Sequence, residues 1–215
     1  MKNLLMLAVL MICSAAFSQE LFIVKSSEKY GIVNENGVVV IPTDHASITN
    51  LQKITKDWSK VQIDGLWGII TKKGGIAVEA KYEEINDFNV YKKGWALVKQ
   101  GGKWGFINDK GREVVSPEYD SIGKFDEHTK GLSLVEANGL KGLIDKDGNI
   151  AISVKYSSID KYGQTIKGWA LVKSKEGKSG FIDADGKEVV PVIYDNIDSF
   201  REKAPEAEIE ASSAE

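Results

Sequence analysis

The chain has 215 residues, with 28 basic and 31 acidic side chains, a formal net charge of -3 and 42% hydrophobic residues. This length allows one or two ordinary domains, and the near balance of interleaved charges leaves no basic stripe, which argues against a nucleic-acid partner. A single cysteine excludes a disulfide framework within the chain.

Residues 1–18 have the pattern of a secretory signal peptide. Lys2 precedes an apolar run from Leu4 to Ala16, and small residues at Ala16 and Ser18 form a cleavage site before Gln19. The run is shorter than the roughly 20 residues that a membrane span needs. We therefore expect export to the periplasm, outer envelope or medium, removal of Cys13 with the signal peptide, and no membrane span in the mature chain.

The rest of the chain repeats one pattern, in which a glycine enters a short apolar strand and a second glycine closes a turn six residues later. The anchor glycines are Gly31, Gly68, Gly105, Gly142 and Gly180, in steps of 37, 37, 37 and 38 residues, and the turn glycines are Gly37, Gly74, Gly111, Gly148 and Gly186. We divide the chain into repeats 19–52, 53–89, 90–126, 127–163 and 164–200, followed by an acidic tail, 201–215, that we expect to be disordered.

Each repeat contains three short runs rich in Val, Ile, Phe and Trp, which predict antiparallel strands. In the third repeat these runs are 95–100, 103–108 and 112–116. Gly101-Gly102 suits a two-residue hairpin turn, and Gly111 suits a left-handed position at the end of the next turn.

A connector follows the third strand of each repeat, and its apolar residues lie three apart, which predicts a helical turn or a coil. The connector begins near a tyrosine that recurs in four repeats as Tyr82, Tyr119, Tyr156 and Tyr194, with His45 in the first. We expect these tyrosines to pack between neighbouring repeats.

The predicted fold is all-β, a tandem array of about five three-stranded meanders. One such meander cannot bury its own faces, so neighbouring repeats must cover them. We expect an open, superhelical, solenoid-like array, with a closed five-bladed propeller-like ring as the alternative.

Lys103-Trp104-Gly105-Phe106-Ile107, with Gly111, Val115 and Tyr119, is similar to the unit of the WG-containing repeat family. The resemblance covers residues 20–200. The sequence departs from the family pattern at the Trp position, which holds Tyr30, Lys141 and Ser179 in three repeats, and at the Tyr position, which holds His45 in the first. It implies a β-rich repeat architecture and an interaction role, and it carries no catalytic residues.

The residues before four of the anchor glycines, Tyr30, Trp67, Trp104 and Lys141, are the candidate binding residues. A site that accepts lysine in place of tryptophan is expected at a surface. Flat rings there could anchor a protein partner or stack on an envelope glycan. The alternative is that the aromatic residues belong to the core.

Little in the sequence indicates catalysis, a metal or a cofactor. Asp145 to Asn149 resembles the start of a calcium loop, but hairpin turns favour Asp, Asn and Gly for backbone reasons. His45 and His128 do not share metal-ligand spacing. We expect a non-catalytic surface for a protein partner in the envelope, with glycan binding as the alternative. A hydrolase that uses a carboxylate pair such as Glu83-Glu84 is a weaker alternative.

Overall fold

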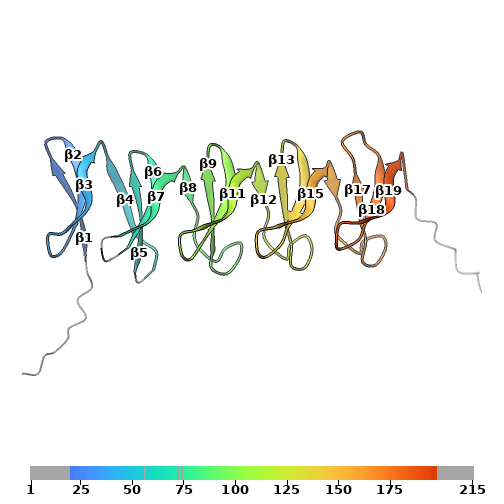
Figure 1. Ribbon diagram of the computed structural model, residues 1–215, viewed down its shortest axis with the longest axis horizontal. Helices are drawn as coiled ribbons and strands as arrows, with labels where there is room; N and C mark the ends of the chain where they lie inside the picture. Colours follow the sequence, from blue (N-terminus) through green and yellow to red (C-terminus); the bar gives the residue numbers. More distant parts are fainter. Residues whose placement is uncertain (1–19, 56, 72, 74, 198–215) are drawn as a thin grey trace, which may run out of the picture. The chain divides into compact units, whose positions relative to one another are not determined.

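The computed structural model describes residues 20–55, 57–71, 73 and 75–197. The predicted signal peptide with Cys13, the turn glycine Gly74, the end of the fifth repeat and the predicted acidic tail lie outside the described residues. The chain divides into two compact units, Met1–Lys81 and Tyr82–Glu215. All regular secondary structure of the described residues is β (Figure 1).

Small antiparallel sheets follow one another along the sequence. The first sheet contains β1 (Leu21–Ser26), β2 (Lys29–Asn34) and β3 (Val39–His45). The second contains β4 (Ile48–Lys53), β5 (Trp58–Ile63), β6 (Leu66–Thr71) and β7 (Ile76–Tyr82). The third contains β8 (Glu84–Ile85), β9 (Trp95–Gln100), β10 (Lys103–Asn108) and β11 (Glu113–Tyr119).

Two further sheets belong to the second unit. The fourth sheet contains β12 (Ser121–Ile122), β13 (Ser133–Ala137), β14 (Leu140–Ile144) and β15 (Ile150–Tyr156). The fifth contains β16 (Ser158–Ile159), β17 (Ala170–Lys173), β18 (Ser179–Ile182) and β19 (Glu188–Tyr194). The prediction of an all-β tandem array of short antiparallel meanders is confirmed.

The connector differs from its prediction, because its first part is extended rather than helical. Ser121 and Ile122 form β12, which pairs with β13 of the next meander through Ser121↔Glu136 and Ile122↔Val135. The second to fifth sheets therefore have four strands, not three. The residues spaced by three, Tyr119, Ile122 and Phe125, lie in two different strands and a loop, so their spacing does not mark one helical face.

In the first, third, fourth and fifth sheets, the last strand bulges where it pairs with the strand that carries the anchor glycine. In the third sheet Trp104 pairs with Tyr119 and Phe106 with Val115, so the bulge lies opposite Gly105. A Cβ atom on Gly105 would lie 2.4 Å from the Val115 carbonyl oxygen. The glycine is needed for this close approach of two backbones.

The turn glycines have a different role. Gly111 has a φ of 77°, and Gly101 and Gly102 have φ values of 59° and 74°. Two successive positive φ values are what a tight two-residue hairpin turn requires. Gly111 closes a turn in which the Asn108 side chain accepts hydrogen bonds from the backbone N–H groups of residues 110 and 112.

Neighbouring sheets pack face to face within each unit, and this explains the paired apolar residues of the central strand. Ile144 of β14 belongs to a core with Phe106 and Val135, between the third and fourth sheets. The preceding residue, Leu143, belongs to a core with Val172 and Ile182, between the fourth and fifth sheets. Successive side chains of a strand point to opposite faces, so both faces of β14 are buried.

Candidate functional site

The residue before the anchor glycine lies at the rim of the core in the first four sheets, whereas in the fifth sheet this residue is Ser179, which is 3% exposed. Tyr30, Trp67, Trp104 and Lys141 are all half-buried. Trp104 packs against the core that contains Phe106 and Tyr119, and Tyr30 packs against the core between the first and second sheets. Tyr30 and Trp104 thus contribute to packing and keep an exposed part.

A lysine lies over the ring at three of these positions. The Nζ atoms lie 5.4 Å from the ring centroid of Tyr30 for Lys25, 5.3 Å from Trp67 for Lys60, and 5.1 Å from Trp104 for Lys99. An ammonium group at this distance is attracted to the electron-rich face of the ring. A sugar that stacked on that face would have to displace the lysine.

The other tryptophans divide between core and rim. Trp95 is only 7% exposed, and its ring lies 5.4 Å from Phe106 and 5.8 Å from Phe125, measured between centroids. Trp58 and Trp169 are half-buried. Trp95 therefore belongs to the hydrophobic core of the third repeat.

The recurring tyrosine is buried in three sheets and exposed in the fifth. Tyr82, Tyr119 and Tyr156 are between 1% and 3% exposed, whereas Tyr194 is 46% exposed. Tyr82 donates its hydroxyl hydrogen to Glu113 at 2.8 Å, and Tyr156 donates to Glu188 at 3.4 Å. Burial, followed by the charge of Glu118, raises the pKa of Tyr119 to about 12, so these phenols stay neutral.

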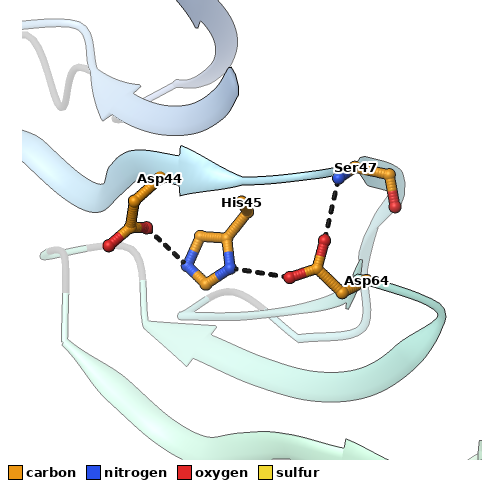
Figure 2. A network of polar contacts seen from close by, with 4 residues as sticks. All are labelled: Asp44, His45, Ser47 and Asp64. Atoms are coloured by element: carbon orange, nitrogen blue, oxygen red, sulfur yellow. Dashed lines mark hydrogen bonds and ion pairs between the residues drawn. The ribbon is translucent and has the colours of Figure 1, made fainter. Parts of the chain in front are cut away.

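The first sheet has His45 in place of this tyrosine, and two carboxylates hold its ring (Figure 2). Nδ1 lies 3.0 Å from Asp64 Oδ2, and Nε2 lies 3.1 Å from Asp44 Oδ1. The Ser47 backbone N–H donates to Asp64 Oδ1 at 2.8 Å. These two hydrogen bonds, from Ser47 and then His45, lower the pKa of Asp64. Each ring nitrogen of His45 therefore faces a carboxylate oxygen.

This group combines residues that the sequence does not bring together. Asp64 is 19 residues from His45 and lies in the turn between β5 and β6. The contact between His45 and Asp64 was not predicted, because the sequence alone does not show which turn of the second sheet faces the end of β3. The departure of His45 from the tyrosine pattern was the available signal.

The carboxylates of the turns bind their own backbone. Asp145 Oδ1 accepts hydrogen bonds from the backbone N–H groups of Asp147 and Asn149, both at 2.8 Å. Asp183 Oδ1 does the same for residues 185 and 187. Among the residues that the structure describes, no group of three or more His, Cys, Asp or Glu side chains could hold a metal ion.

The fold and these surfaces define an all-β tandem-repeat protein. Its sequence belongs to the WG containing repeat family, whose profile matches residues 67–104, 104–140, 142–178 and 180–203. The first repeat, with Tyr30 and His45, lies outside the matched residues. Among curated proteins, none matches this sequence. In the described part of the chain, no helix has the length and apolar character to cross a membrane.

Several solved structures are similar at low identity. HIRA(644-1017) is 10% identical, with a TM-score of 0.28 over 80% of this chain and 52% of that one. Hsv2p of Kluyveromyces lactis is 11% identical, with a TM-score of 0.29 over 78% of this chain and 58% of that one. The chain thus spans between half and three fifths of these structures.

Proposed function

We propose that this chain is an exported, non-catalytic repeat protein that binds another protein in the envelope through the outward face of its fifth sheet. We define this face by Val190, Tyr194 and Ile197, which occupy the positions of Val115, Tyr119 and Ile122 in the third sheet.

The exposure of Tyr194 carries this proposal. At the same positions of the third sheet, Val115, Tyr119 and Ile122 are 5%, 3% and 7% exposed, because the fourth sheet covers them. Tyr194 is 46% exposed, and Val190 and Ile197 are half-buried. A face that is covered by a β-sheet in other repeats suits a protein partner that supplies apolar side chains and an acceptor for the tyrosine hydroxyl.

A protein partner is favoured over an envelope glycan. Glycan binding by this chain would use the rings at Tyr30, Trp67 and Trp104, but each carries a lysine at 5.1 to 5.4 Å from its centroid. The same ring and lysine pairs are compatible with a protein surface, where aromatic anchors and an acidic partner residue could both be accommodated.

Site-specific photo-crosslinking tests the proposal. A photoreactive phenylalanine at position 194 should capture a specific envelope protein, and excess unmodified protein should suppress the adduct. The matched control carries the same group at Ile166, an exposed apolar residue in a loop of the fifth repeat. Equal adducts at both positions, or none at 194, would contradict binding through the outward face.

Export is tested separately by the N-terminal sequence of the protein recovered from the envelope or medium. We expect the mature chain to begin at Gln19. Recovery of a chain that still begins at Met1 would contradict cleavage after Ser18.

A further inference from the structure

A cavity of about 340 Å³ lies between the first and second sheets, within the first unit. Ile41 of β3 and Val61 and Ile70 of the second sheet lie at its buried side. The side chains of Ile41, Val61 and Ile70 are at most 3% exposed and belong to one hydrophobic core. Leu66 and Ile76, which are 38% and 50% exposed, line the cavity where it opens to solvent. Ligand sites of small molecules commonly start at about 300 Å³.

The cavity lies where a tyrosine ring lies in another junction. Between the third and fourth sheets, Tyr119 shares a core with Val135 and Ile144, and Val154 packs against it. The corresponding residues of the first junction are His45, Val61, Ile70 and Ala80, and all four line the cavity. A smaller ring at 45 and a smaller side chain at 80 leave this space unfilled.

The polar groups at the cavity point to one kind of ligand. His45, Asp64 and Glu79 line it, and among the residues that the structure describes no lysine or arginine lines it. Asp44 and Asp64 hold the His45 ring, so its orientation at the cavity is fixed (Figure 2). Carboxylates accept hydrogen bonds and repel anions, so a ligand with a donor group is favoured and an anionic ligand is disfavoured.

We propose that this cavity binds a neutral or cationic molecule with a single aromatic ring and a hydrogen-bond donor, which takes the place that the Tyr119 ring has between the third and fourth sheets. The apolar walls bury the ring, and the carboxylates of Asp64 and Glu79 receive the donor. Apolar cavities of about 150 Å³ already bind benzene, so one ring fits in this volume.

The first test uses p-cresol, the side chain of tyrosine as a free molecule. Calorimetric titration of the purified mature chain should show saturable binding at one site, and the methyl resonances of Ile41, Val61 and Ile70 should shift with the same affinity. No saturable binding, or shifts that avoid these methyl groups, would overturn the proposal.

Cavity-filling variants provide the second test. His45→Tyr supplies the ring covalently, so we expect p-cresol to bind at least about tenfold more weakly, which corresponds to about 1.4 kcal/mol. Ala80→Val fills part of the space, retains His45 and should also weaken binding. Ile166→Tyr adds a tyrosine away from the cavity and should bind as the wild type does. Thermal unfolding confirms that each variant is folded, and unchanged affinity in a folded His45→Tyr protein would refute the site.

A charge series tests the ligand class. Tyramine and 4-hydroxyphenylacetate carry the same phenol with opposite charges. Tyramine should bind more tightly than p-cresol, and 4-hydroxyphenylacetate more weakly. Asp64→Asn should reduce the preference for tyramine over 4-hydroxyphenylacetate. The reverse order of affinities in the wild type would overturn the assignment of a neutral or cationic ligand.

Discussion

The junction between the first and second sheets and the junction between the third and fourth sheets use the same strand positions but fill them differently. Between the third and fourth sheets, Tyr119 is 3% exposed and packs in a core with Val135 and Ile144. Between the first and second sheets, the side chain of His45 is 31% exposed and is held by carboxylates beside a cavity. The strand framework therefore tolerates the loss of an interior ring, because the backbone pairing is fixed by other residues.

The largest expected effect is the loss of the ring from the filled junction. Tyr119→Ala should lower the free energy of unfolding by about 3 to 5 kcal/mol, because it leaves a cavity among well-packed side chains. His45→Ala, whose ring is partly exposed, should cost less than about 1 kcal/mol. Urea denaturation followed by circular dichroism measures both, and equal losses would show that the two junctions do not differ in packing.

A second prediction concerns what the two junctions share. A Cβ atom on Gly31 would lie 2.7 Å from the Ile41 carbonyl oxygen, and one on Gly105 would lie 2.4 Å from that of Val115. Gly31→Ala and Gly105→Ala should each cost about 1 to 3 kcal/mol, because the last strand of the sheet must move away from the strand that carries the glycine.

Gly123→Ala is the control for these glycine variants. The atom nearest to a Cβ added at Gly123 is the Leu134 carbonyl oxygen, 3.5 Å away, which is an ordinary contact. The free energy of unfolding of this variant should therefore stay within about 0.5 kcal/mol of the wild-type value. If Gly31→Ala proved as mild as Gly123→Ala, the first sheet would not depend on the close approach that the other sheets use.

The smallest expected effect is a pH dependence of the stability that comes from His128. Burial lowers the pKa of His128, and its Nε2 lies 3.0 Å from the Asp160 carbonyl oxygen. The unfolded chain, with a histidine pKa of about 6.5, therefore binds the proton more readily than the folded chain does. Stability contributed by neutral His128 is present above pH 6.5 and is lost as the pH falls below it.

His128→Gln removes this titration and leaves His45 in place. The difference in melting temperature between the variant and the wild type should therefore shrink or change sign in favour of the variant between pH 7.5 and pH 5.5. A difference that stays constant with pH would show that His128 takes up its proton equally well in both states.

Much of the fold could be predicted from the sequence. The period of the anchor glycines indicated the repeats, and the runs of β-branched and aromatic residues indicated short antiparallel strands, which the structure confirms in 95–100 and 103–108. The turn at Gly101-Gly102 could also be predicted, because few residues other than glycine adopt two successive positive φ values. The connector could not, since residues 121–122 become a strand only by pairing with β13 of the next meander.

The candidate sites were only partly within reach of sequence reasoning. The exception at His45 was visible as a departure from the tyrosine pattern. Its contact with Asp64 and the cavity beside it depend on how the faces of two sheets meet. The lysines over the rings of Tyr30, Trp67 and Trp104 likewise come from cross-strand placement rather than from a motif.

The sequence alone determined that this chain is a tandem array of β meanders, because strand propensity and turn glycines are local properties that recur in each repeat at a fixed period. The tertiary structure decided which side chains are enclosed. Burial depends on whether a neighbouring sheet covers a face, so Tyr119 and Tyr194 share one place in the pattern and differ from 3% to 46% in exposure.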